Sequence, residues 1–257
     1  MKQVLNPTLE DLRMECVLVQ AWKKTDAHIR QHSWYSDTLE LDYQSLRLPA
    51  FIDELQERLK SPLDWTPAPL DLVPAPKAQR WELRGDEWHP KQGEKVGKKL
   101  RPLAHVGLQD QVLATAMMMC LADRVETAAG DPRLSPRQAG NRKQVLAYGH
   151  RLFCDADGGP LQHRWGSSKL YRQFYHDYQT FLERSKLVAT ELKNSNSSGE
   201  IAIVRSDLSK FYDRVRPSLL HDKVKQLQLP SDNTAFFDLF QRAFDWKWRE
   251  NVVCQEN

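Results

Sequence analysis

Along most of this 257-residue chain, hydrophobic residues recur among polar ones with the spacing that is typical of helices. In six segments apolar residues recur three and four positions apart, which places them on one side of a helix. These segments are residues 8–32, 49–59, 108–127, 168–193, 217–227 and 233–248. The third is the clearest, because two neighbouring apolar rows run along its length. We therefore expect a chain dominated by helices.

The ends of several helices are marked by residues that favour a helix boundary. Thr8 and Asp11 have the spacing of an N-terminal capping pair. Pro49 and Pro217 stand where a first helical turn tolerates proline. Asp232 precedes the last helix and is expected to cap it.

Shorter apolar runs predict a few strands. Residues 70–77 and 99–106 flank a long polar insertion that contains three glycines, so we expect the two strands of an enlarged β-hairpin. Residues 201–204 are apolar and mostly branched, and we interpret residues 201–206 as a buried strand, although a run this short does not exclude a helix. Five prolines between residues 62 and 76 predict an irregular connection. Helices with a few strands indicate an α+β fold.

The composition narrows the class of protein. Apolar residues make up 40% and charged residues 28%, which is typical of a globular chain and not of a disordered one. The formal net charge is only +3, but residues 77–101 hold eight Lys/Arg against four Asp/Glu, and residues 132–153 hold five Lys/Arg and no acid. Such stretches indicate either a surface that faces a polyanion or an ordinary solvated face.

Several classes of protein find no support. The four cysteines include no C-x-x-C pair, which argues against a zinc site and a disulfide framework. The longest apolar run has eleven residues, too few to span a bilayer, and the N-terminus lacks the apolar region of a signal peptide. Neither the glycine pattern of dinucleotide-binding proteins nor that of the P-loop occurs. We expect a cytoplasmic protein without membrane attachment.

The stretch IAIVRSDLSKFYDRV, residues 201–215, carries the most specific candidate chemistry. Its apolar run leads to Asp207 and, six positions later, to Asp213. A carboxylate at the end of a buried strand lies at the rim of the core and suits Mg²⁺, which prefers oxygen ligands. The alternative is structural, because aspartates are common in turns and both residues would then cap the turns that follow.

Three blocks of sequence occur in an order that points to a known family. They are LRPLAHVGLQDQVLATAMMMCLADRVE at residues 100–126, QAGNR at residues 138–142 and DLSKFYD at residues 207–213. The last resembles the first catalytic motif of reverse transcriptases, the first resembles their fingers block, and QAGNR resembles the turn that follows it in bacterial members. Together they cover roughly residues 74–229. The preceding residues look most like those of divergent bacterial reverse transcriptases that act in defence against phage.

The resemblance implies the fingers and part of the palm of a right-hand polymerase. Residues 1–70 would form an N-terminal helical extension, residues 71–195 the fingers with connecting helices, and residues 196–257 the start of the palm. The family's aromatic-x-Asp-Asp motif has no counterpart here, since no two aspartates are adjacent in the sequence. We therefore expect these residues to be the N-terminal part of a longer polymerase, truncated before the second catalytic motif and inactive alone.

The same resemblance assigns the catalytic roles at the palm. Asp207 would be the catalytic ligand of two Mg²⁺ ions, and the Leu208 carbonyl would be a further oxygen ligand. Tyr212 stands where the family places the ring that excludes the 2′-hydroxyl of an incoming nucleotide. A rigid ring under the sugar rejects a ribonucleotide by steric clash.

Further roles fall to the fingers. Arg101 and Lys77 would bind the nucleotide triphosphate, for which a planar guanidinium is well suited. Asn141 and Arg142 would contact the backbone of the template or primer, unless they form a purely structural turn. The reaction would be attack by a primer 3′-hydroxyl on the α-phosphate of a deoxynucleotide, directed by an RNA template.

Two other functions stay open at this stage. One is a non-catalytic scaffold that binds nucleic acid with a polymerase-like fold. The other is an RNA-dependent RNA polymerase of similar palm design, which the behaviour of Tyr212 would distinguish. The expected partners are an RNA template, a DNA or RNA primer and deoxynucleotides, while the state of assembly is left open.

Overall fold

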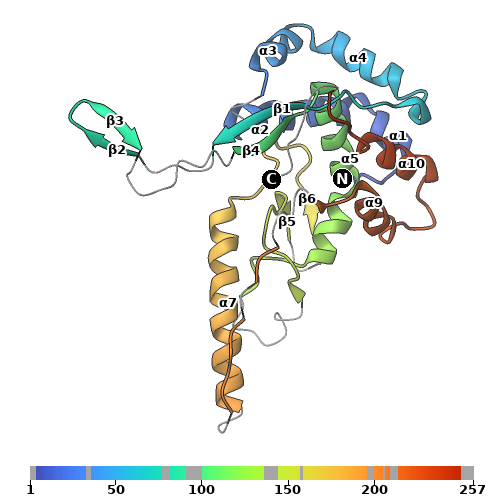
Figure 1. Ribbon diagram of the computed structural model, residues 1–257. Coiled ribbons are helices and arrows are strands. Elements are labelled where there is room, and N and C mark those ends of the chain that lie inside the picture. The colour runs from blue at the N-terminus through green and yellow to red at the C-terminus, as the bar shows by residue number, and fades with distance from the viewer. Residues whose placement is uncertain are drawn as a thin grey trace.

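The computed structural model describes residues 4–32, 36–76, 81–90, 100–135, 144–156, 159–195, 199–204, 206–208 and 214–249. The fold is helix-rich with small antiparallel sheets, in agreement with the α+β class (Figure 1). The helices are α1 Leu9–Arg13, α2 Glu15–His32, α3 Thr38–Leu46, α4 Leu48–Arg58, the 3₁₀ turn η1 Pro62–Asp64, α5 Leu108–Ala129, α7 Phe174–Ser195, α9 Pro217–Lys225 and α10 Thr234–Ala243. The strands are β1 Asp71–Pro76, β2 Trp81–Arg84, β3 Glu87–Pro90, β4 Leu100–His105, β5 Cys154–Asp155 and β6 Gln162–His163.

One hydrophobic core joins helices from both ends of the chain. It is built mainly from apolar side chains of α1, α2, α4, α5 and α10, and α3 adds Leu41. Its fully buried members include Leu12, Leu18, Phe51, Leu55, Leu113, Met117 and Phe236. Burial of each such side chain contributes about 1.5–3 kcal/mol, so this packing positions every other element. The core contains residues from all three predicted segments, 1–70, 71–195 and 196–257. The boundaries at residues 70 and 195 stay predictions.

Several helix boundaries agree with the sequence, and others differ from it. The Oγ1 of Thr8 accepts the N–H of Asp11 at 3.1 Å, which confirms the predicted cap. The helix expected over residues 8–32 is broken at Met14 into α1 and α2. At the last helix the capping prediction for Asp232 is wrong, because Asn233 caps α10 and the carboxylate of Asp232 instead binds the guanidinium of Arg124 at 2.9 Å.

The enlarged hairpin is confirmed. β1 pairs antiparallel with β4, with Asp71 opposite His105 and Pro76 opposite Leu100. The described part of the insertion forms a second hairpin of β2 and β3, which projects from the helical body (Figure 1). Its two-residue turn begins at Gly85 with φ 63°, the left-handed conformation that a type II′ turn requires and glycine adopts without strain.

The buried strand expected at residues 201–206 is not formed. Residues 201–204 run as an extended trace back along α7 (Figure 1), and Ile203 and Val204 are 54% and 87% exposed. A strand exists only where another backbone satisfies its N–H and C=O groups, and no described segment pairs with this one. Composition alone favoured a strand there, but the described fold supplies no neighbour.

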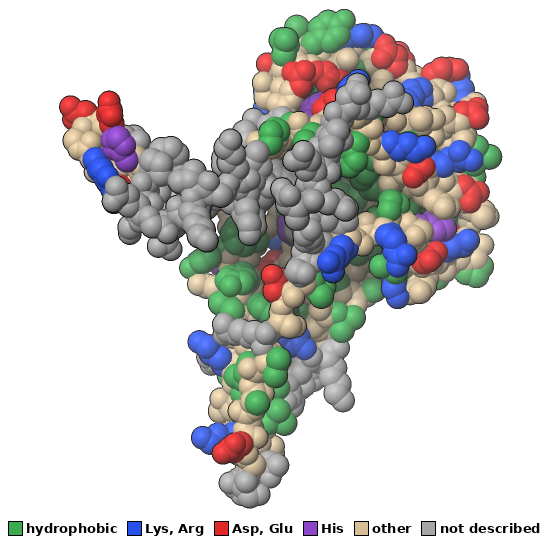
Figure 2. Space-filling view, viewed as in Figure 1, with side chains coloured by type: hydrophobic (Ala, Val, Ile, Leu, Met, Phe, Trp, Pro, Cys, Tyr) green, Lys and Arg blue, Asp and Glu red, His purple; other side chains and the backbone are tan. Residues whose placement is uncertain are grey.

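No helix among the described residues is long and apolar enough to cross a membrane. The longest two, α5 and α7, differ in surroundings. α5 is buried on several sides, whereas Asp177 is the one buried residue of α7. Figure 2 shows hydrophobic side chains along α7 where it extends away from the body.

Candidate nucleotidyl-transfer site

Asp207 lies on the segment that returns along α7. Its side chain is exposed, and the next residue, Leu208, is 69% exposed. The stretch before it, Ile201 to Ile203, borders a groove of about 680 Å³ together with α7 and residues 146–148. The groove is mainly apolar, and Arg184 is the one charged residue in its lining. Asp207 therefore follows directly after an apolar groove, on a surface open to solvent.

Two arginines make charged hydrogen bonds that involve α7. Arg172 donates two hydrogen bonds to the buried carboxylate of Asp177, at 3.0 and 3.1 Å. Arg184 donates to the carbonyl of Val145 and lies over the ring of Tyr148, 5.8 Å from its centroid. Hydrogen bonds with charged partners are the stronger class, and these contacts link α7 to the residues just before it and to residues 145–148, although little of the helix is buried.

The end of α5 is tied to the loop below it by a buried ion pair. The Nε of Arg151 donates to Glu126 at 2.8 Å, and its other nitrogens donate to the carbonyls of Ala147, Glu126 and Gly130. The second oxygen of Glu126 accepts the N–H of Leu152 at 3.0 Å. Both side chains are almost fully buried, and nearly every polar atom of the pair is satisfied.

Lys24 is a buried cation that the sequence interpretation missed. Its Nζ donates to three backbone carbonyls, those of Arg164 at 3.3 Å, Ser167 and Lys169 at 3.1 Å. Burial lowers the pKa of Lys24 to about 8. The signal was present in the sequence, since Lys24 lies in line with the buried Val17 and Ala21 on the apolar face of α2.

Beside Lys24 lie a histidine and a cysteine that might suggest catalysis. His163 is paired with Cys154 across the β5–β6 ladder. Burial, followed by the charge of Lys24, lowers the pKa of His163 to about 3, and burial raises the pKa of the Cys154 thiol to about 12. A thiol that stays protonated is a poor nucleophile, so this cluster does not support cysteine catalysis.

Asp110, within the fingers block, is structural. Its carboxylate accepts the indole N–H of Trp65 at 3.1 Å and the N–H of Ala68 at 2.8 Å. Burial raises the pKa of this carboxyl above its ordinary value. The residue thereby fastens the proline-rich connection between η1 and β1 to the start of α5.

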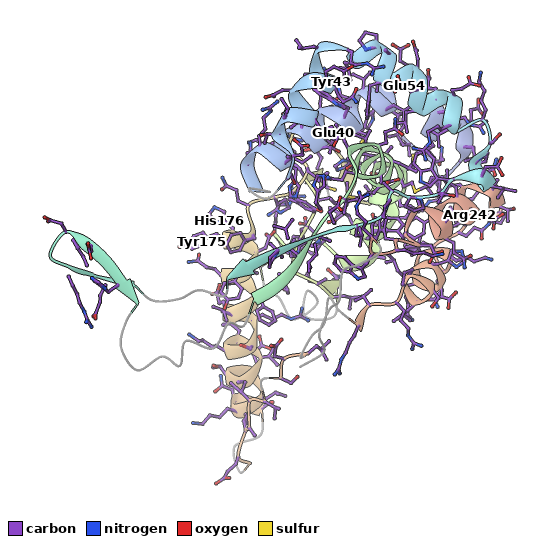
Figure 3. The ribbon with its side chains drawn as sticks, turned by 45° about the horizontal axis from the view of Figure 1, so that its top comes forward. Glu40, Tyr43, Glu54, Tyr175, His176 and Arg242 are labelled. Atoms are coloured by element: carbon purple, nitrogen blue, oxygen red, sulfur yellow. The ribbon has the colours of Figure 1, made fainter. Side chains whose placement is uncertain are left out.

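The structure gives partial information on the predicted nucleotide-binding residues. Arg101 lies on β4 opposite Ala75, next to the Pro76–Leu100 pair that ends the ladder. Lys77, Asn141, Arg142 and Tyr212 lie outside the described residues, as does the side chain of Arg101. Figures 1 and 3 place this end of the hairpin near the N-terminal end of α7, where Tyr175 and His176 lie. Among the predicted site residues, the side chains of Asp207 and Leu208 are thus the described ones.

The described residues do not form a complete metal site. No three His, Cys, Asp or Glu side chains among them come together in a way that could hold a metal ion. Asp207 offers one carboxylate, and Leu208 offers a carbonyl. These oxygens match the ligand preference of Mg²⁺, but a pair of ions needs more carboxylates than this stretch supplies.

Comparison of the chain with family models, with curated proteins and with solved structures gives no match.

Proposed function

We propose that the chain is the fingers and first palm segment of an RNA-directed DNA polymerase. The observation that carries the proposal is the register of β1 and β4. Ala75 pairs with Arg101 and Pro76 with Leu100, so Lys77 follows β1 at the same end of the hairpin as Arg101. Two cations at one end of a hairpin suit a triphosphate, which is the role that the resemblance gives them.

In this proposal the chain binds and orients the reactants. Arg101 and Lys77 hold the triphosphate, and Tyr212 lies against the sugar and excludes ribonucleotides. Asp207 and the carbonyl of Leu208 would hold Mg²⁺, which supplies charge stabilisation for the transferred phosphoryl group, together with carboxylates from outside the described residues. Asn141 and Arg142 contact the template or primer. The resemblance of the first 70 residues supports a role in bacterial defence against phage.

The test is primer extension by the complete natural gene product with Mg²⁺ on an RNA template. Deoxynucleotides and ribonucleotides are supplied in separate reactions. We expect incorporation of deoxynucleotides, and a loss of at least about 100-fold in Asp207→Ala. Asp53→Ala, which removes another exposed carboxylate from α4, is the matched control and should retain activity. The 257-residue chain alone should be inactive.

The same assay tests the preference for deoxynucleotides and the role of Asp207. Tyr212→Ala should admit ribonucleotides. Incorporation of ribonucleotides by the unaltered protein would instead indicate an RNA-dependent RNA polymerase. Equal activity of the Asp207→Ala variant would contradict the catalytic role of that carboxylate.

A non-catalytic scaffold is the second candidate. The observation that favours it is the exposed and solitary position of Asp207 among the described residues. A scaffold would bind RNA, incorporate no nucleotide on any template and tolerate Asp207→Ala without loss of its biological effect. Protection of bacteria from phage by the Asp207→Ala variant, measured by plaque counts, would support this function over the polymerase.

A further inference from the structure

Arginine side chains are engaged almost everywhere in the part of the chain that the structure describes. Carboxylates, backbone carbonyls or aromatic rings bind those of Arg13, Arg30, Arg47, Arg58, Arg84, Arg124, Arg133, Arg151, Arg164, Arg172, Arg184 and Arg249. The arginines that make no such contact are Arg214, Arg216 and Arg242, all exposed. Figure 3 shows Arg242 on the outer side of α10. Among the arginines whose side chains the structure describes, the unengaged ones therefore lie between residues 214 and 242.

Two of these arginines belong to a basic surface at α9. Arg216 is the N-cap residue of this helix, and Lys223 follows seven positions later, two turns along the same face. From Arg214 to Lys225 the sequence holds four Lys/Arg and a single acid, Asp222. Figure 2 shows Lys and Arg side chains gathered over α9 and the stretch that leads into it.

Helix stability does not explain the two arginines, whereas Lys223 lies in the last turn of α9, where the helix dipole favours a cation. The N-terminal end of a helix carries partial positive charge, so Arg214 and Arg216 stand where the helix dipole disfavours a cation. The first turn of α9 has no acidic residue, and Arg216 makes no side-chain capping bond. The contacts of α9 with the core come from the apolar Leu220 and Val224. The charges of Arg214 and Arg216 therefore bring repulsion without a partner among the described residues.

We propose that Arg214, Arg216 and Lys223 form a binding surface for the phosphates of a nucleic-acid strand. Guanidinium and ammonium groups that are free of internal partners are the groups that bind backbone phosphates. The inference rests on the proposed function, in which a template or primer passes Asp207. Arg214 follows Asp207 by seven positions, at most about 25 Å of extended chain, so one strand can reach both. Contacts to phosphate do not depend on base sequence.

The experiment measures the affinity of the full chain for a fluorescein-labelled 20-nucleotide RNA by fluorescence anisotropy at several KCl concentrations. The variant carries Arg214→Ala, Arg216→Ala and Lys223→Ala. We expect its Kd to rise about 10- to 100-fold near 0.1 M KCl. The slope of log Kd against log[KCl] should fall by about 2, because each lost contact with a single strand removes about 0.7.

A matched control removes the same charge elsewhere. It carries Lys23→Ala, Arg47→Ala and Lys60→Ala, three cations of α2 to α4 or the turn after α4, and its Kd should stay within about 2-fold of the unaltered chain. Equal weakening in the control would show that net charge, and not this surface, governs binding. An unchanged Kd and slope in the α9 variant would overturn the proposal.

Two further arms separate this proposal from its alternatives and from the proposed function. Vesicles with anionic lipids and a polyglutamate peptide serve as competitors, and displacement of the RNA by either at equal charge concentration would overturn the assignment to nucleic acid. In the complete natural gene product, Asp207→Ala should leave the affinity for RNA unaltered but abolish primer extension. Primer extension that persists in the α9 variant at saturating RNA would leave the polymerase function intact and place the defect in binding.

Discussion

The buried pair of Arg151 and Glu126 allows a prediction worked from the structure. Arg151→Met keeps most of the apolar stem but removes the guanidinium. The carboxylate of Glu126, about 5% exposed, would keep the single donor from Leu152. The carbonyl groups of Ala147 and Gly130, which accept hydrogen bonds from Arg151, would also lose a donor.

The expected cost is large for a single substitution. Removing one partner of a buried ion pair costs about 3–5 kcal/mol, because the other charge is left without compensation. Water can reach the two partly buried carbonyls, so their loss adds little, and we expect about 4 kcal/mol in total. Against a typical stability of about 5–15 kcal/mol, this is a substantial fraction. It corresponds to a fall in Tm of about 10 °C for a chain of this length.

Urea unfolding followed by circular dichroism measures the effect. Arg133→Met is the matched control, since Arg133 pairs with Asp131 at 2.9 Å but is 37% exposed. A pair with that exposure contributes under about 1 kcal/mol. Adding Glu126→Gln to Arg151→Met removes the uncompensated charge and should recover about 2 kcal/mol.

The reasoning fails if Arg151→Met costs less than 1 kcal/mol, or if it costs no more than Arg133→Met. It also fails if Glu126→Gln destabilises the Arg151→Met background further. In the first two cases the loop after α5 would be held by packing alone.

Three other substitutions test the structure at separate points. Burial lowers the pKa of Lys24 to about 8 from the ordinary 10.5. Between pH 8 and pH 10.5 the lysine is therefore protonated in the unfolded chain and neutral in the folded one. As a result, this group makes the free energy of unfolding rise by about 3 kcal/mol from pH 8 to pH 10.5. Lys24→Met should remove that rise in urea titrations at both pH values. Gly130→Ala should cost more than about 3 kcal/mol by thermal melting, since φ is 82° and an added Cβ would lie 1.7 Å from the carbonyl oxygen of Gln144. Asp110→Ala should cost about 2–3 kcal/mol, because the buried indole N–H of Trp65 loses its acceptor.

Each of these has an outcome that contradicts it. Identical slopes of stability against pH in Lys24→Met and the unaltered chain would mean that the lysine does not titrate in this window. A Gly130→Ala variant as stable as the parent would place Gln144 further away. If Asp110→Ala melts like the parent, then Trp65 does not depend on this acceptor.

The elements that could be predicted are those whose signal is local. The i+4 rows of α5 and the polar insertion between β1 and β4 are visible in the sequence, and both elements are formed. The start of α7 was expected at residue 168 and lies at Phe174. The later start has its cause in a tertiary contact. Lys24 donates hydrogen bonds to the carbonyls of Ser167 and Lys169 and so holds this stretch in an irregular turn.

The candidate site could be predicted only in part, for a related reason. A strand at residues 201–206 depends on a neighbour that no local pattern specifies, and the described fold supplies none. The strand that was expected to end at Asp207 is not formed, and the described residues before Asp207 are exposed instead of buried. The burial of Lys24 could have been inferred, because this residue lies on the apolar face of α2. The free arginines before α9 were missed because the lack of a partner leaves no mark in the local sequence.

The nesting of one hairpin within another has a practical consequence for anyone who handles this protein. The β1–β4 ladder is closed by the Pro76–Leu100 pair, and β2 and β3 pair with each other at the far end of the projection. The two-residue turn at Gly85 touches nothing that the core needs, since an added Cβ there would meet no atom within 4 Å. This tip is therefore a natural attachment point. A short epitope or a dye placed there should report on the protein without disturbing its fold.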